Sequence, residues 1–302
     1  MSWITSTTRS EENGLYFKVL QPAPQLRKWV RYYWILKDEA RAPQIDEYLA
    51  PDGFEEIIFS YADGFTRDEV LGSGTRRQVV KKSYVVGSKP YGVTCSRTGQ
   101  LAMIGVKLWP QVLHAILRVP LHNLSGRPLL LSDIDSPVLN ELESRLLDAD
   151  SERRIKDTLD SALLHATAIE FNDLLTFSVR QIFESRGSLT IDELIDRCGV
   201  HYRTLERAFR DRVGLPPKTI ARVLRFKHAF SALSGEATAR GFSIADCGYY
   251  DQSHFCREFK SFTGRTPTQF FRDRLSVDVA KFCLELDLRT LNQSAPSTDF
   301  VL

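Results

Sequence analysis

The chain has 302 residues, of which 43% are apolar and 26% charged, so it is long enough for two globular domains of ordinary size. Its formal net charge is only +2, but residues 176–275 hold 17 Lys and Arg against 11 Asp and Glu, which leaves the remainder at −4. A basic module on an acidic remainder is typical of a nucleic-acid binder. The alternative explanation is a chance uneven distribution of solvated surface charges.

Cysteine usage and hydropathy argue against a disulfide framework, a zinc site and a membrane anchor. The five cysteines are odd in number and widely spread, and no two have C-x-x-C spacing. Reduced thiols of a cytosolic protein fit this pattern. The polar N-terminus lacks the apolar core of a signal peptide, and no run approaches the roughly 20 apolar residues that span a bilayer. We therefore expect a cytoplasmic protein.

Between about Leu15 and Ile134, short apolar runs alternate with turn clusters such as Ala50-Pro-Asp-Gly53. Strands of this length and spacing predict a sandwich or a small barrel, which we assign to residues 14–135. A helix is expected over Pro110–Leu117, because proline suits the first helical position. The predicted strands are Trp29–Leu36, Glu56–Ser60, Gln78–Val80, Tyr84–Val86 and Leu101–Leu108.

Residues 136–186 are predicted to form three amphipathic helices, because their leucines and isoleucines recur at spacings of three and four. The part up to residue 172 forms a helical linker. Its apolar faces are expected to pack on the β-rich domain, with a dimer seam as the alternative. The apolar positions are Leu139, Leu142 and Leu146 in the first helix and Ile155, Leu159 and Leu163 in the second, and the third helix runs over Asp173–Arg186.

The most informative stretch of the chain, Arg203–Pro217, is repeated at an offset of fifty residues in Ser253–Pro267. In each copy two apolar residues four apart share one face of a helix, while basic residues project elsewhere. A glycine that favours the left-handed conformation then ends the helix, and a proline suits the start of the next. The matched pairs are Leu205 and Phe255, Arg207 and Arg257, Phe209 and Phe259, Arg210 and Lys260, Gly214 and Gly264, and Pro217 and Pro267.

The residues before each copy complete a helix-turn-helix layout. Thr190 with Glu193 predicts a capping box for a short helix before the first copy. Asp251 is a good N-cap for the second copied helix, whereas His201 is a weaker cap for the first. A connecting helix is expected over about Pro217–Leu233, some 17 residues or roughly 25 Å long.

The repeated helices and the residues that precede them resemble the AraC/XylS-type DNA-binding domain, in which two helix-turn-helix units flank one connecting helix. The resemblance covers residues 180–275 and is most specific in Cys247-Gly-Tyr-Tyr-Asp-Gln-Ser-His-Phe255. It is also carried by Arg203-Thr-Leu-Glu-Arg-Ala-Phe, Val213-Gly-Leu-Pro-Pro-Lys218 and Arg222-Val-Leu-Arg-Phe-Lys-His-Ala229. One departure is Ser243-Ile244, where the family has an apolar residue followed by Ala, so altered packing of the second unit is expected.

A looser resemblance extends to the N-terminal domain that is often joined to this module, a cupin-like β structure that senses a ligand or mediates pairing. It is carried by Leu49-Ala-Pro-Asp-Gly53, Val86-Gly-Ser-Lys-Pro-Tyr91, Gly105-Val-Lys-Leu-Trp-Pro110 and Val119-Pro-Leu121. The expected fold class is thus α+β. A β-rich cupin-like domain (14–135) is followed by a helical linker (136–172), an all-α double helix-turn-helix domain (173–275) and a tail (276–302) that includes an extra segment over 277–288.

The resemblance implies a sequence-specific transcription regulator whose two recognition helices enter adjacent major grooves of double-stranded DNA. It puts base-reading positions at Arg203, Glu206 and Arg207, where Arg would contact guanine and Glu would accept from cytosine. Pairing of Arg207 with Asp211, and of Arg257 with a neighbouring carboxylate, is the structural alternative. The full set of expected DNA-binding residues is Tyr202, Arg203, Thr204, Glu206, Arg207, Arg210, Gln252, Ser253, His254, Cys256, Arg257 and Lys260.

The connecting-helix cations Lys218, Arg222, Arg225 and Lys227 are expected to contact phosphates or carboxylates rather than bases. No catalytic residue, metal or cofactor is expected, because residues 1–113 contain no histidine and no phosphate loop or nucleophile motif is present. Further candidate partners are RNA polymerase, a small-molecule effector and a second copy of the chain.

Two alternatives stay open for the N-terminal domain: one that only dimerises or binds a protein, and a metal-free enzyme domain fused to a DNA reader. Four aromatic residues, Tyr33, Trp34, Tyr91 and Trp109, are candidates to line an effector pocket, with burial in the β core as the alternative.

Overall fold

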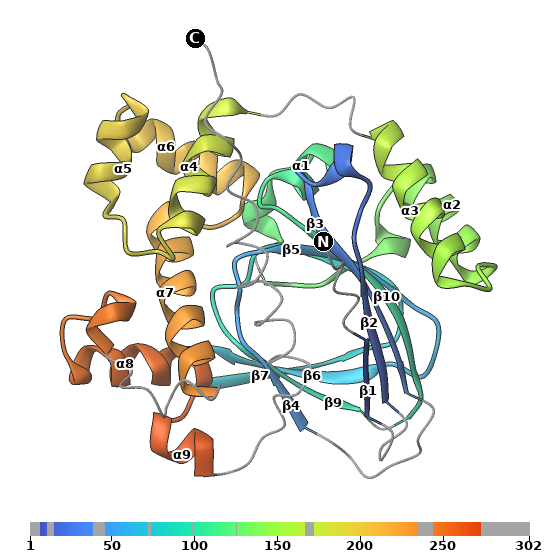
Figure 1. Ribbon diagram of the computed structural model, residues 1–302, viewed down its shortest axis with the longest axis horizontal. Coiled ribbons are helices and arrows are strands. Elements are labelled where there is room, and N and C mark those ends of the chain that lie inside the picture. The colour runs from blue at the N-terminus through green and yellow to red at the C-terminus, as the bar shows by residue number, and fades with distance from the viewer. Residues whose placement is uncertain are drawn as a thin grey trace, which may run out of the picture.

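The computed structural model describes residues 7–10, 15–38, 46–71, 74–97, 99–124, 126–166, 172–234 and 244–272. Within these ranges a β-rich part comes first in the chain and a helical part follows it, and Figure 1 shows the two side by side. The expected α+β class is confirmed. The predicted segment 277–288 and the rest of the tail lie outside the described residues.

The β-rich part consists of two antiparallel sheets. Within the described residues, one sheet has seven strands in the order β1-β2-β3-β10-β5-β8-β11 and the other has four in the order β4-β9-β6-β7. All five predicted strands are present. The strands are β1 Thr7–Ser10, β2 Leu15–Leu20, β3 Val30–Asp38, β4 Asp46–Leu49, β5 Glu55–Ser60, β6 Phe65–Leu71, β7 Gly74–Val80, β8 Tyr84–Val86, β9 Val93–Arg97, β10 Leu101–Leu108 and β11 Leu129–Leu130.

Strand β3 shows why this sequence buries both faces of the larger sheet. Successive side chains of a strand point to opposite faces. Tyr32 and Trp34 join the core between the sheets, whereas Tyr33 and Ile35 join the core beneath the covering helices. Tyr33 and Trp34 are 0% and 8% exposed. Of the two alternatives for these residues, lining an effector pocket or burial in the β core, the structure shows burial.

The helix expected from Pro110 begins two residues later, as α1 (Val112–Leu117). Gln111 adopts a left-handed conformation (φ 81°), which no α-helix can include, so the prediction of a proline start was wrong. The two side-chain oxygens of the buried Glu55 accept hydrogen bonds from the backbone N–H groups of Gln111 (2.9 Å) and Leu113 (2.7 Å). These long-range bonds fix where the helix starts.

We expect Glu55→Gln to flatten the pH dependence of folding. Burial raises the pKa of Glu55 from 4.5 to about 8, although the two N–H donors oppose this shift. The folded protein therefore holds a proton that the unfolded chain has released, and the free energy of unfolding should fall as the pH rises through this window. Denaturant unfolding at several pH values measures the slope of the free energy of unfolding against pH. An identical slope in the variant would contradict the assignment.

Two linker helices, α2 (Pro137–Leu147) and α3 (Glu152–Ala166), pack on the β-rich part. Their buried leucines and isoleucines belong to one core with β3, β5 and β10. This is the packing expected for the linker, rather than the dimer seam.

The helical part holds two further cores, one for each helix-turn-helix unit. In Figure 1, α7 runs from the first unit (α5, α6) to the second (α8, α9). The helices are α4 Asp173–Glu184, α5 Ile191–Cys198, α6 Tyr202–Arg212, α7 Pro217–Ser234, α8 Gln252–Thr263 and α9 Pro267–Arg272. A 3₁₀ turn, Ile244–Cys247, precedes α8.

Candidate nucleic-acid interface

The first unit consists of α5, a tight turn and α6. The predicted capping box is present: the Glu193 N–H donates to Thr190 Oγ1 (3.2 Å), and the Thr190 N–H donates to Glu193 Oε2 (2.8 Å). Gly199 ends α5 in a left-handed conformation (φ 62°). These local signals set the angle at which the chain enters α6.

Helix α6 has a buried face and an exposed face. Leu205 and Phe209 are both 0% exposed and pack in the core of the first unit. The exposed side chains are those of Tyr202, Arg203, Thr204, Arg207 and Arg210, and Glu206 is half-buried. All six expected side chains of the first recognition helix thus keep access to solvent.

The cationic side chains of α6 are available to a ligand. No ion pair joins Arg203, Arg207 or Arg210 to any residue that the structure describes, so the alternative pairing of Arg207 with Asp211 does not occur. The Tyr202 hydroxyl donates to Glu206 Oε1 (3.1 Å). Partial burial and this bond raise the pKa of Tyr202.

Helix α8 repeats the arrangement. Phe255 and Phe259 are buried in the second core, at 4% and 0% exposure. Of the expected DNA-binding side chains, Gln252, Ser253, Arg257 and Lys260 are exposed, and His254 and Cys256 are half-buried. Among the described residues Arg257 has no ion pair either. The His254 ring packs edge-on against the Tyr249 ring, with 5.3 Å between the ring centres, and this contact limits rotation of the His254 side chain.

The two recognition helices differ at their N-caps. The Asp251 carboxylate accepts from the His254 N–H (2.6 Å), whereas the His201 side chain makes no capping bond. We expect Asp251→Ala to lower the free energy of unfolding by about 1 kcal/mol. His201→Ala, at the equivalent position, should change it little. Equal effects of both substitutions in chemical denaturation would refute this difference.

Connecting helix α7 uses its cations mainly inside the protein. Arg222 Nε donates to Glu258 Oε1 on α8 (2.6 Å), and Arg225 donates to the Gly187 carbonyl (3.0 Å). Lys227 is only 5% exposed and faces the β-rich part. Of the four cations only Lys218 is exposed, so it is the best candidate for a phosphate contact on this helix.

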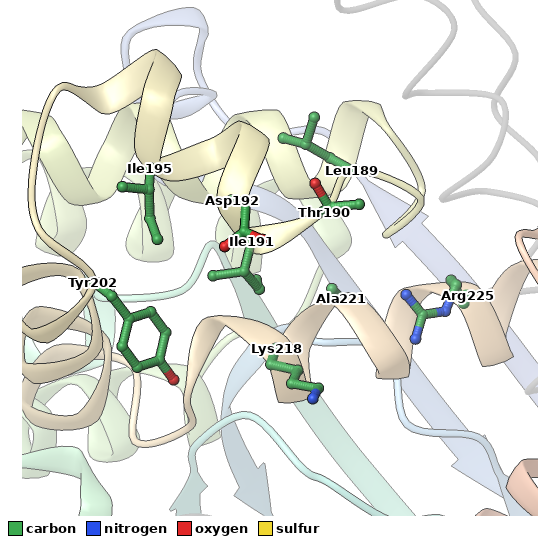
Figure 2. A pocket seen from close by; sticks show the side chains of 9 residues that line it. All are labelled: Leu189, Thr190, Ile191, Asp192, Ile195, Tyr202, Lys218, Ala221 and Arg225. Carbon is green, nitrogen blue, oxygen red and sulfur yellow. The ribbon is translucent and has the colours of Figure 1, made fainter.

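An open groove of about 450 Å³ lies between the start of α5, the start of α6 and α7 (Figure 2). Ile191, Ile195 and Ala221 provide apolar lining, Lys218 and Arg225 provide cations, and Asp192 provides a carboxylate. The groove adjoins the exposed first turn of the recognition helix.

Three residues near the interface were not predicted. Tyr250, next to the α8 N-cap, is 93% exposed. Tyr48 and Phe54, from the β-rich part, are each 1% exposed and belong to the cores of the second and first units, respectively. The only signal for the last two was the turn cluster Ala50–Gly53, which lies between them in the sequence.

The described residues contain no cluster of three or more His, Cys, Asp or Glu side chains that could hold a metal ion. None of the described helices combines the length and the apolar character needed to cross a membrane.

Two stretches of the chain match known protein families. Residues 194–273 match a family described as a helix-turn-helix domain, and residues 18–129 match one described as a domain of unknown function (DUF6597). No curated protein matches the sequence.

Among solved structures, ToxT from Vibrio cholerae O395 is 11% identical, covering 76% of this chain and 96% of that one, with a TM-score of 0.41. Unsaturated fatty acid bound wild-type ToxT from Vibrio cholerae strain SCE256 is also 11% identical (79% and 94% covered, TM-score 0.39). The 7S globulin of Momordica charantia is 12% identical (34% and 32% covered, TM-score 0.25). At these scores the likenesses do not assign a function.

Proposed function

We propose that the chain is a sequence-specific transcription regulator of the AraC type that reads two adjacent major grooves with α6 and α8, because residues 194–273 match a helix-turn-helix domain family. One observation carries the proposal. At either end of a single connecting helix, a recognition helix buries its apolar face and leaves its cations exposed. Helix α7 has 18 residues and is about 27 Å long, which suits grooves about 34 Å apart along one face of DNA.

The roles of individual residues follow from their chemistry. Arg203, Arg207 and Arg257 donate to guanine, and Gln252 donates to and accepts from adenine. Glu206 accepts from cytosine, with Tyr202 holding its carboxylate in place. Arg210, Lys260, Thr204 and Ser253 bind phosphate oxygens or base edges, as do the half-buried His254 and Cys256.

The remaining parts of the proposal concern the rest of the chain. We assign residues 14–135 to the sensing or pairing domain, 136–172 to the linker and 173–275 to the DNA-binding domain. The β-rich domain responds to an effector, or it mediates contacts with a partner protein, and it has no catalytic role. Because α2 and α3 complete its core, calorimetry against a metabolite panel should use the full chain.

Selection from a pool of random duplexes tests the function directly. The expected result is enrichment of two short elements about one helical turn apart, without two-fold symmetry, because the two recognition helices differ in sequence. The logarithm of affinity should fall linearly with the logarithm of salt concentration. If no sequence is enriched and no duplex is bound at low salt, the proposal fails.

A further inference from the structure

A seven-residue segment of the β-rich part, Tyr48–Phe54, reaches into both helix-turn-helix units. It contains the end of β4 and the turn that leads to β5. Its two end residues are aromatic, and each is 1% exposed. Tyr48 belongs to the core of the second unit and Phe54 to the core of the first.

Tyr48 packs between α7 and α9. Its ring lies 5.6 Å from that of Phe230 on α7 and 4.9 Å, edge-on, from that of Phe270 on α9. Its hydroxyl donates to the carbonyl of Phe262, near the end of α8 (3.2 Å). Carbonyls in the last turn of a helix have no partner within the helix, so this bond stabilises the end of the second recognition helix.

A second donor from the β-rich part reaches the same carbonyl. The Gly92 N–H donates to the Phe262 oxygen (3.1 Å). A Cβ atom at Gly92 would lie 2.0 Å from the Tyr48 hydroxyl, so only glycine leaves room for both donors. The end of α8 is therefore held from two directions.

Phe54 makes the corresponding contact with the first unit. Its ring lies 4.9 Å from that of Phe183 on α4 and 5.3 Å from that of Trp109, which follows β10. Phe183 belongs to the core in which Leu205 and Phe209 of α6 are buried. The first recognition helix thus packs on a core that an aromatic ring from the β-rich part completes.

Between the two aromatic residues, the segment faces the connecting helix. Lys227 Nζ on α7 lies 5.1 Å from the centre of the Phe54 ring. Asp52 forms an ion pair with Lys107 of β10. Burial opposes ionisation of Asp52, but the ammonium groups of Lys107, Lys89 and Lys227 outweigh it and lower the pKa of Asp52 to about 2. The segment thus remains charged opposite α7 at neutral pH.

Two further contacts of the β-rich part fall at the ends of the recognition helices. His122 Nδ1 lies 3.9 Å from Asp211 Oδ1 near the end of α6. Val70 of β6 lies directly beside Gly264, at the end of α8. The first turns of both helices, with Arg203 and Gln252, remain exposed. The β-rich part therefore holds the recognition helices by the ends opposite to those that would read bases.

We propose that Tyr48 and Phe54 are positioning residues that fix the distance and angle between α6 and α8, so that the β-rich part sets the subsite spacing the protein accepts on DNA. This inference rests on the proposed function. One seven-residue segment contributes to both cores, so a shift of either aromatic residue would move one recognition helix relative to the other.

The test uses the full chain and the selected duplex with its two subsites moved together or apart by one base pair. Wild type should prefer the selected spacing. Tyr48→Phe keeps the ring but loses one donor, and Phe54→Leu keeps an apolar group but loses the ring contacts. The ratio to measure is the affinity for the selected spacing divided by the affinity for the altered spacing. Each substitution should reduce this ratio by about threefold or more. Tyr61→Phe is the matched control, because it removes a similar hydroxyl bond, to the Glu143 carbonyl of α2, and should leave the ratio unchanged.

Amide hydrogen exchange provides a readout that needs no DNA. Tyr48→Phe should speed exchange at the end of α8, and Phe54→Leu should speed exchange in α4 and α6, with no such change in Tyr61→Phe. Wild-type spacing ratios or wild-type exchange in both interface variants would overturn the inference. If wild type binds no duplex, the proposed function fails, and exchange alone still decides whether the two residues hold the helices.

Discussion

Replacing Phe259 by Ala should lower the free energy of unfolding by about 3–5 kcal/mol, the largest stability effect we expect of any single substitution. Phe259 is 0% exposed and lies at the centre of the second helix-turn-helix core. Its ring lies 5.6 Å from each of the rings of Phe226, Phe255 and Phe270. Truncation removes these contacts and leaves a cavity where α7, α8 and α9 meet.

Denaturant unfolding followed by circular dichroism measures this loss. The matched control is Phe177→Ala on α4, because Phe177 is 42% exposed and its truncation should change the free energy of unfolding by about 0.5 kcal/mol or less. DNA affinity should fall only in the Phe259 variant. A small effect of Phe259→Ala on stability would mean that the second core is assembled differently.

Arg207→Ala and Arg257→Ala should each weaken specific DNA binding by about 1–3 kcal/mol and relax the preference at one subsite. Both side chains are exposed, and neither has an ion pair with a described residue. Their removal should therefore leave stability unchanged, so that the loss reports the missing contact with DNA. Because they lie on different recognition helices, each should affect a different subsite.

Titrations with the selected duplex and with single-base variants measure both effects. Arg153→Ala, on the exposed face of α3, is the control for loss of one arginine, and it should bind like wild type. Lys218→Ala should instead weaken binding to all sequences alike and reduce the salt dependence, as expected of a phosphate contact. Unchanged affinity in both recognition-helix variants would mean that these helices are misassigned.

Features of the fold that depend on local sequence could be predicted well. The Thr190 capping box, the left-handed glycines after α6 and α8, and the length of α7 all follow from residues close together in the chain. The burial of Leu205 and Phe209 follows from helical periodicity alone. Ile244 begins a 3₁₀ turn before α8 and packs against the second core, and the altered packing expected there stays a prediction.

Features that depend on contacts between distant residues could not be predicted. The start of α1 is set by Glu55, more than 50 residues earlier in the chain. Tyr48 contacts Phe262 across 214 residues, and nothing in its neighbourhood distinguishes it from any other strand tyrosine. Likewise, the residues around Lys227 in the chain gave no sign that it is buried with its ammonium group over the ring of Phe54.

The central claim is that one chain reads two successive major grooves with α6 and α8. Guanine-methylation interference on the selected duplex tests this most directly, because methyl groups at N7 block contacts in the major groove only. We predict two clusters of guanines whose methylation interferes with binding, about one helical turn apart on the same face of the DNA, one lost in Arg207→Ala and the other in Arg257→Ala. A single cluster, or two clusters that both respond to the same substitution, would contradict it.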